Sequence, residues 1–270
     1  MRFTVITPNK NGGKYLEQAI LSVLTQRREG IDIEYLVIDG GSTDSSSEIL
    51  SRYQKDISRI IYEPDTGPAA AINKGLKIAT GEIVSWLNAD DLYHPGAFAR
   101  VLATFIRHPD RALYFGACRI INEEGEEIRK AITRFKEFFF PLSSRFTIQC
   151  INYISQPSLF FQRNAQLKAG LLREDLVAAW DYDLTLRLWR QGGGACIEGA
   201  PLADFRWHKD SISAKRFHKQ FKEEFEAAAK DAGRLSLQTW IHGMVRIGIV
   251  SSYTLMAMSR KKFKDVGNAY

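Results

Sequence analysis

The sequence has 270 residues, of which 45% are hydrophobic, and it carries a formal net charge of +6. This length and composition can fill the core of one large domain or of two closely packed halves, as a globular enzyme requires. Three widely spaced cysteines exclude a disulfide framework and a cysteine-based metal site, and they favour a reducing compartment.

The opening residues hold an apolar run that is too short for a signal peptide. The longest apolar stretch, 240–258, is interrupted by polar residues and falls short of a membrane span. We therefore expect a cytoplasmic protein, with a place at the inner face of the cell membrane as an open alternative.

Short runs rich in β-branched residues alternate with helical patterns through the first half of the chain. Strands are expected at residues 3–6, 34–39, 59–62 and 82–87. Helices are expected between and after them: from about Tyr15, after the capping-box pattern of Ser45 and Glu48, from Gly67 to Ala79, and from Pro95 at the first helical position. This β-α repetition predicts an α/β fold with a mainly parallel sheet flanked by helices, in which ligands bind beyond the carboxyl ends of the strands.

The alternation loosens from about residue 118, where a second, substrate-shaping part is expected. We therefore expect a main domain at 1–215, made of halves at 1–117 and 118–215, followed by a C-terminal helical region at 216–270. The division predicts that the second half shapes the site for a substrate.

The C-terminal region begins polar and ends apolar. Residues at helical spacing are followed by a basic cluster: Trp240, Met244, Ile247, Ser251 and Met258, then Arg260, Lys261, Lys262 and Lys264. Such a segment can lie in a membrane interface, or it can pack on the protein's own core. The basic residues suit an anionic substrate or membrane surface, with a merely solvated basic face as the alternative.

Polar clusters follow all four expected strands, at 7–9, 39–44, 63–65 and 88–91. Because the carboxyl ends of parallel strands meet at one edge of a sheet, these clusters should converge on one crevice. Each cluster by itself is also explained by turn or helix-cap chemistry. Asp39 can accept hydrogen bonds from a base or a ribose, with an Asx turn into Gly40 as the alternative.

Asp90 and Asp91 place two adjacent carboxylates in the loop after the fourth expected strand. Adjacent carboxylates repel one another unless a cation lies between them or one is protonated. A hard divalent ion such as Mg²⁺ or Mn²⁺ prefers oxygen ligands and often shares them with substrate phosphates. A surface turn in which one aspartate caps the next helix is the alternative.

The segments 5–11, 34–44, 63–75 and 87–91 occur in an order and spacing that resembles the family 2 glycosyltransferases, which have a GT-A nucleotide-sugar-binding fold. The resemblance covers about residues 1–215. It implies that the following residues border the nucleotide-sugar donor: Thr7, Pro8, Asn9, Asp39, Asp65, Asn73, Asn88 and Asp90.

The same resemblance implies a Mn²⁺ or Mg²⁺ cofactor held by Asp90, Asp91 and His208. The first aspartate of the family's Asp-x-Asp motif is Asn88 here, which keeps an oxygen but loses a charge, so weaker metal binding is expected. Arg206 beside His208 would help to neutralise a diphosphate.

Asp181 lies near the start of an expected helix, at the position where the family places its catalytic base. Trp180 stands where the family usually has a glutamate, and Asp183 is the alternative base within the same helical turn. Gln156 matches the family's acceptor-side loop and is expected to bond sugar or phosphate. A carboxylate near a helix start is also explained by the helix dipole alone.

The implied activity is inverting transfer of a sugar from a nucleotide diphosphate sugar, with a UDP-sugar favoured, to a hydroxyl of a saccharide or lipid-linked acceptor. Cell-surface polysaccharide or glycolipid synthesis is the expected setting, and no nucleic-acid partner is expected. Two alternatives are a nucleotidyltransferase that makes nucleotide sugars and a non-catalytic nucleotide-sugar-binding module. The first would normally require a glycine-rich basic loop after the first strand, which residues 7–13 do not supply.

Overall fold

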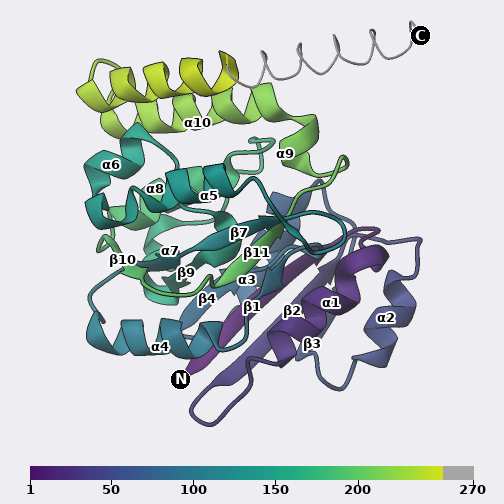
Figure 1. Cartoon of the computed structure of the whole chain (residues 1–270). Coiled ribbons are helices and arrows are strands. Elements are labelled where there is room, and N and C mark those ends of the chain that lie inside the picture. Colours follow the sequence, from purple (N-terminus) through teal and green to yellow (C-terminus); the bar gives the residue numbers. More distant parts are fainter. Residues whose placement is uncertain (252–270) are drawn as a thin grey trace, which may run out of the picture.

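The computed structural model describes residues 1–251, and Figure 1 shows the path of the chain. Within these residues a seven-stranded sheet has the order β10-β6-β9-β4-β1-β2-β3. Its strands are β1 (Arg2–Asn9), β2 (Asp32–Asp39), β3 (Arg59–Tyr62), β4 (Ile83–Trp86), β6 (Leu113–Gly116), β9 (Leu159–Gln162) and β10 (Gly194–Ile197). The pairs β1–β2, β1–β4, β2–β3 and β6–β10 are parallel, whereas β9 runs antiparallel to both neighbours. The predicted mainly parallel α/β sheet is confirmed.

A smaller four-stranded sheet, of order β5-β11-β7-β8, lies beside the main one. Its strands are β5 (Leu92–Tyr93), β7 (Cys118–Ile121), β8 (Glu127–Ile128) and β11 (Ala203–Arg206). The parallel pairing of β7 with β11 brings the start of the second half of the chain next to residues that follow it by more than eighty positions. His208 follows β11 of this second sheet, which therefore places it near the first half of the chain.

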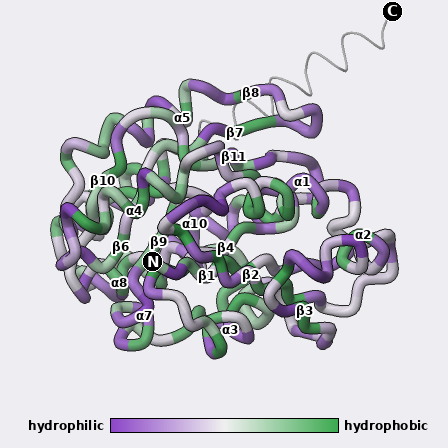
Figure 2. The backbone as a smooth tube through the Cα atoms, turned by 90° about the horizontal axis from the view of Figure 1, so that it is seen from below, coloured by the Kyte–Doolittle hydropathy of each residue, from purple (hydrophilic) through white to green (hydrophobic). Residues whose placement is uncertain are grey.

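Alternation along the strands divides the core into two layers, one on each face of the main sheet. Val5 and Tyr35 pack with α1 (Gly13–Leu24), α2 (Ser46–Arg52) and α4 (Ala97–Arg107). Ile6 and Leu36 face the other layer. That layer holds α3 (Pro68–Ile78), α5 (Lys130–Glu137), α6 (Arg145–Cys150), α7 (Arg163–Ala169), α8 (Trp180–Trp189) and α10 (Phe217–Ala232), with the short α9 (Ile212–Lys215) before it. In Figure 2 the hydrophobic residues (green) lie mainly in the interior, where the strands run.

Two expected helix starts differ from the structure. Pro95 precedes the helix, which begins at Ala97 after Gly96 in the left-handed region (φ 75°), because the chain is still held to the second sheet one residue earlier. Ser45 is the N-cap of α2, but its hydroxyl makes no capping hydrogen bond. The Asp44 carboxylate accepts from the Ser46 N–H at 3.0 Å instead.

The expected division at 117/118 is not a boundary in space. Strands β9 and β10 belong to the expected second half, yet they are part of the same sheet as β1 and β4. The expected boundary at 215/216 is crossed as well, because Ala227 and Ala228 of α10 lie in the main core. The chain up to α10 is therefore one packed unit.

The C-terminal helical region contains a break. Helix α10 ends at Ala232, Gly233 adopts a left-handed φ of 96°, and a further helix follows over residues 237–251. Figure 1 shows this last helix (yellow) beside α10 at one end of the molecule, away from the sheet. Met258 and the basic cluster at 260–264 lie outside the described residues. Within residues 1–251, no helix combines the length and the apolar content needed to cross a bilayer.

Gly75 provides a test of the contact between α3 and the sheet. A Cβ at this position would lie 2.6 Å from the Ile6 Cγ2 atom, which is closer than such atoms can approach. We expect Gly75→Ala to lower the free energy of unfolding by about 1–3 kcal/mol, because overpacking outweighs the gain in helix propensity. Urea unfolding of Gly248→Ala is the control, since a Cβ there has open space. Equal stability of the two variants would contradict this packing.

Candidate active site

A cavity of about 940 Å³ lies beyond the carboxyl ends of β1 and β4. Residues from both halves of the chain and from the C-terminal region line it. They include Pro8, Asn9, Asp65, Asn88, Asp90, Lys136, Gln156, Asp181, His208 and Gln220. The predicted crevice is therefore present, and most of the expected site residues surround it.

The loop between β2 and α2 is held by Asp39. Its Oδ1 atom accepts from the backbone N–H groups of Gly41 (3.0 Å) and Ser42 (2.8 Å), and its Oδ2 atom accepts from the side chain of Asn9 (2.6 Å). The Asx-turn alternative is thus what the structure shows, and Asp39 is buried behind the cavity. Asn9 lines the cavity, and its buried Oδ1 atom has no hydrogen-bond partner. Asp39 as a direct nucleotide contact stays a prediction.

Besides Asp39, two residues expected to touch the donor do not line the cavity. The Thr7 hydroxyl is buried and lies 3.1 Å from the hydroxyl of Tyr35. Asn73 is buried and exchanges hydrogen bonds with the Leu172 backbone, while also donating to Glu174 at 2.8 Å. Asn73 therefore connects α3 to the segment before α8, and the expectation of a donor contact is corrected for both residues.

Asp65 faces the cavity at the end of β3 and caps the start of α3. Its Oδ1 atom accepts from the Gly67 N–H at 3.0 Å. A Cβ at Gly40 would lie 2.4 Å from the Asp65 Oδ2 atom, so a side chain there would displace this carboxylate from its present position. This contact joins the ends of β2 and β3 on one side of the cavity.

The two carboxylates of the acidic loop after β4 lie in different surroundings. Asp90 lines the cavity, and its Oδ2 atom lies 2.9 Å from His208 Nε2, an interaction that raises the pKa of the imidazole. Asp91 is fully buried and accepts from the Arg206 backbone N–H (2.9 Å) and from Asn88 (2.9 Å). Burial and the neighbouring Asp90 carboxylate raise the pKa of Asp91 well above its usual range. The structure therefore gives Asp91 an anchoring role in place of the expected metal contact.

Arg206 does not reach the cavity either. Its guanidinium is buried and donates to the backbone carbonyls of Asp90 (3.0 Å), Asn122 (3.1 Å) and Glu123 (2.9 Å). It also donates to Gln18 and lies over the Tyr15 ring. The expected diphosphate contact is corrected to a structural one, because every donor direction of the side chain is turned into the protein.

The two candidate bases point in different directions from α8. Residues two positions apart on a helix lie on opposite sides, so only one can face the cavity. Asp181 lines the cavity and is half-buried, whereas Asp183 is buried and pairs with Arg187 at 2.8 Å. Burial raises the pKa of Asp181 to about 6, against the opposing charge of Lys136. The structure thus favours Asp181 over Asp183 as the proton acceptor.

Several cavity residues carried no signal in the sequence. Lys136 lies on α5 and donates to Ser155 at 3.1 Å, and Arg129 stacks over the Trp207 ring at 4.0 Å. Helix α10 adds Phe217, Gln220 and Phe221 to the lining. A basic or aromatic side chain in a helical pattern looks the same whether it faces solvent or a cavity, so spacing alone could not find these residues.

Asp90 and His208 fit a divalent ion only in part. Among the described residues no group of three or more His, Cys, Asp or Glu side chains is placed to hold a metal. Asp90 and His208 offer one carboxylate and one imidazole beside each other at the cavity. Mg²⁺ and Mn²⁺ commonly take one or two protein ligands and complete their coordination with substrate phosphates and water. The donor set therefore fits an ion that arrives with a diphosphate.

A mainly parallel sheet with a cavity at the carboxyl ends of β1 and β4 defines an α/β protein with a ligand-binding crevice of the kind that the expected GT-A fold has. The family model of glycosyl transferase family 2 matches residues 4–167, which is more than half of the chain. The protein belongs to this family, as the sequence resemblance predicted.

Curated relatives extend the comparison. A glycosyltransferase of Nostoc is 38% identical over 108 residues, which cover 39% of this chain and 33% of that protein. TuaG of Bacillus subtilis, whose name assigns it to teichuronic acid biosynthesis, is 29% identical over 218 residues, which cover 79% of this chain and 82% of TuaG. The chain spans about a third of the length of the first curated relatives that it matches.

Solved structures confirm the fold. Residues 1–349 of TarS from S. aureus, in complex with UDP-GlcNAc, match with a TM-score of 0.68 and 17% identity, covering 86% of this chain and 66% of that one. The mannosyltransferase PcManGT from Pyrobaculum calidifontis, in complex with GDP-Man and Mn²⁺, matches with a TM-score of 0.64 and 19% identity, covering 96% and 79%. The GT-A architecture is common to all three chains.

Glu224 on α10 provides a test of the electrostatics beneath the cavity. Burial raises the pKa of this carboxyl to about 7, although Gln220 and Asn152 donate hydrogen bonds to it. Because the folded state holds the proton more tightly than the unfolded state, stability falls as the pH rises toward about 7 and stays lower above it. We expect Glu224→Gln to raise the unfolding free energy above that pH, by on the order of 2 kcal/mol. The gain should shrink in acid.

Urea unfolding at several pH values measures this gain. Glu226→Gln is the matched control, because Glu226 lies on the same helix but its side chain is 58% exposed. A gain for Glu224→Gln that does not change with pH would show that the buried carboxylate is not the cause.

Proposed function

We propose that the protein transfers a sugar from a nucleotide diphosphate sugar to an acceptor hydroxyl with inversion at the anomeric carbon. One observation carries the proposal: the half-buried Asp181 carboxylate lines the same cavity as Asp65, Asp90 and His208. A proton acceptor and the family's donor-binding loops thus face one space. Membership in glycosyl transferase family 2 supports the same activity.

Asp181 would remove the proton from the attacking hydroxyl. The Tyr182 N–H donates to its Oδ1 atom at 2.8 Å, which fixes the carboxylate and leaves Oδ2 for the acceptor. The raised pKa makes Asp181 a stronger base than an exposed aspartate, while Lys136 keeps it ionised near neutral pH. In a single displacement, an α-linked donor would give a β-linked product.

Donor binding is proposed at the opposite side of the cavity. Pro8, Asn9, Asp65 and Asn88 would border the nucleotide sugar, and Gln156 would contact the sugar or a phosphate. Gln156 is held by its donation to the Trp86 carbonyl at 2.8 Å, and it accepts from Asn88 at 3.1 Å. These contacts fix both amides at the cavity wall before any ligand binds.

A divalent cation, Mn²⁺ or Mg²⁺, is proposed at Asp90 and His208. It would neutralise negative charge on the leaving nucleoside diphosphate. Lys10 and Lys14 also line the cavity and would add positive charge near the phosphates. The binding of Mn²⁺ by PcManGT, together with GDP-Man, supports a metal-dependent reaction.

A UDP-sugar is the favoured donor, which the TarS complex with UDP-GlcNAc supports. The acceptor would be a saccharide or a lipid-linked saccharide in cell-surface polysaccharide or glycolipid synthesis, as the similarity to TuaG suggests. A cytoplasmic site of action agrees with three free cysteines. A lipid-linked acceptor would place the reaction at the inner face of the cell membrane.

Substitution of the two aspartates of α8 tests the assignment of the base. Asp181→Asn should lower transfer by about 10²–10⁴-fold, because the amide cannot accept the proton. Its affinity for the UDP-sugar with Mn²⁺ should be unchanged. Asp183→Asn is the matched control: it should keep transfer per folded molecule but lose stability, on the order of 2 kcal/mol, because it breaks a buried ion pair.

Transfer assays and calorimetric titration of the donor measure the two effects. Undiminished transfer by Asp181→Asn with intact donor binding would refute the proposal. A nucleotidyltransferase would consume diphosphate in the same assay, and a binding module would bind the donor without turnover.

The pH dependence of transfer gives a second test. Protonated Asp181 cannot accept a proton, so kcat/KM should rise with pH and level off above about 6, where the carboxylate is ionised. An exposed aspartate would give this rise about two pH units lower. A kcat/KM profile that is already level well below this value would contradict a buried base.

A further inference from the structure

The helix over residues 237–251 turns an apolar stripe away from the protein. Leu237, Trp240, Met244 and Ile247 are 64%, 67%, 62% and 67% exposed. Their spacing of three, four and three residues places them along one side of a helix. The described part of this helix is long enough to present this side as a continuous surface, and within residues 1–251 no helix is long and apolar enough to cross a bilayer.

The opposite side of the same helix is fixed to the core. His242 is buried and lies 3.0 Å, through its Nδ1 atom, from the Gln149 carbonyl. Thr239 is also buried and donates to the Gly233 carbonyl at 2.8 Å. Because these contacts set the rotation of the helix, the apolar stripe cannot turn inward, and it remains at one end of the molecule (Figure 1).

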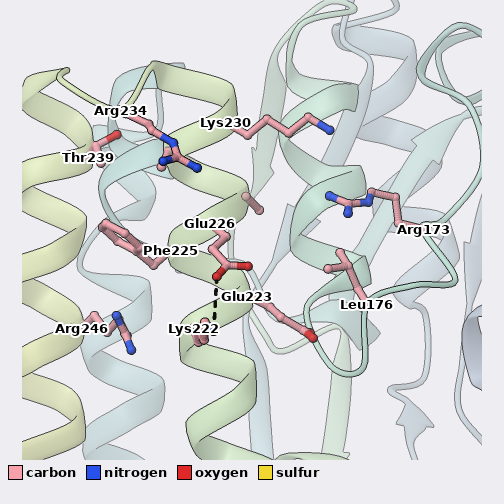
Figure 3. Close-up of a pocket in the computed structure, with 12 residues that line it drawn as sticks. Arg173, Leu176, Lys222, Glu223, Phe225, Glu226, Lys230, Arg234, Thr239 and Arg246 are labelled. Carbon is pink, nitrogen blue, oxygen red and sulfur yellow. Dashed lines mark ion pairs between the residues drawn. The ribbon is translucent and has the colours of Figure 1, made fainter.

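A cationic pocket of about 730 Å³ adjoins this helix (Figure 3). Five basic residues line it together with two acidic ones, Glu223 and Glu226; the basic residues are Arg173, Lys222, Lys230, Arg234 and Arg246. Lys222 pairs with Glu226, and Arg173 pairs with Asp175. Within residues 1–251, the other three have no carboxylate at ion-pair distance, and the Nε atom of Arg246 is buried without a hydrogen-bond partner.

We propose that this end of the protein docks on an anionic lipid bilayer. The apolar stripe would enter the boundary between headgroups and acyl chains, and the cations of the pocket would contact lipid phosphates. Further along the sequence, outside the described residues, stand Arg260, Lys261, Lys262 and Lys264. Docking does not depend on which sugar is transferred, or on whether transfer occurs.

Charge favours a lipid surface over a second copy of the chain. Two copies that met through this helix would bring two regions with an excess of basic residues together, whereas an anionic bilayer attracts the cations of each. A single stripe of four side chains also falls below the roughly 800 Å² per partner that stable protein interfaces bury. An anionic bilayer would therefore receive the apolar stripe, while the cations of the pocket, which lies on the side of the helix that carries Thr239 and Arg246, would attract lipid phosphates from beside the stripe.

Helix α10 would connect docking to the active site. Phe217, Gln220 and Phe221 line the cavity of Asp181, and Lys222 and Lys230 of the same helix line the cationic pocket. A bilayer bound to the outer helix would therefore lie at a fixed distance from the acceptor side of the cavity. If the proposed transfer is correct, a lipid-linked acceptor could reach Asp181 without leaving its membrane.

Sedimentation with vesicles tests the proposal on the full chain. Wild type should bind vesicles of equimolar phosphatidylcholine and phosphatidylglycerol at low salt, and bind phosphatidylcholine alone more weakly. The triple variant Trp240→Ser, Met244→Ser, Ile247→Ser should bind at least about tenfold more weakly, because it loses most of the buried apolar area. Ile106→Ser is the control, since Ile106 is 66% exposed on α4 and should not matter.

Trp240 supplies a second readout. Its fluorescence should shift to shorter wavelength when vesicles are added, and Trp240→Phe should lose that shift while still binding. A variant with Lys230, Arg234 and Arg246 changed to Gln should lose the preference for phosphatidylglycerol but keep the Trp240 shift at high lipid. Transfer to a water-soluble acceptor, measured without vesicles, should be the same for all these variants, which separates docking from catalysis.

Two results would overturn the proposal. Vesicle binding by the folded triple variant equal to that of wild type would show that the stripe is not the lipid contact. A wild type that fails to bind vesicles and forms a dimer that the triple variant dissociates, as measured by sedimentation velocity, would assign the stripe to a second copy instead.

Discussion

The buried guanidinium of Arg206 holds together the parts that make the cavity. Its donors are shared among the carbonyl of Asp90, the carbonyls of Asn122 and Glu123, and the side chain of Gln18. These groups come from the acidic loop, the second sheet and α1. A buried cation needs this many partners to offset its lost hydration, so the three segments can meet only in this arrangement. The same strand carries His208 beside Asp90.

The cavity depends on the contact of these three segments, because neither half of the chain encloses the cavity alone. The first half supplies the ends of β1, β3 and β4, and the later segments supply Asp181, His208 and the side chains of α10. Asp91 and Asn73 make hydrogen bonds between segments that are distant in the sequence. Asp91 accepts from the Arg206 backbone, and Asn73 binds the segment before α8. Residues that a family motif marks for a ligand can thus hold the walls in place.

The two C-terminal helices differ in how much of their surface is exposed to solvent. Helix α10 is buried on the side of Ala227 and Ala228 and faces the cavity through Gln220, whereas the last described helix covers it and keeps its own apolar side outward. A helix usually faces its apolar side toward the core, whereas this one packs Val245 on the core and also exposes Leu237, Trp240, Met244 and Ile247. The exposed apolar stripe is explained if a lipid bilayer, rather than water, contacts that surface, as proposed above.

Strand and helix periods predict the mainly parallel sheet, and the polar residues at strand ends predict the edge at which ligands are expected, because these are local signals in the sequence. The order and spacing of the motifs indicate the family, and the sequence also places Asp181 at a helix start. Which carboxylates face the cavity follows from the folded chain: Asp90 and Asp181 do, while Asp91 and Asp183 are turned inward to Arg206 and Arg187. Neighbouring aspartates look alike in a sequence, and the partner that separates them lies far along the chain. The direction of a side chain is set by these distant partners, so folding, and not spacing, assigns its role.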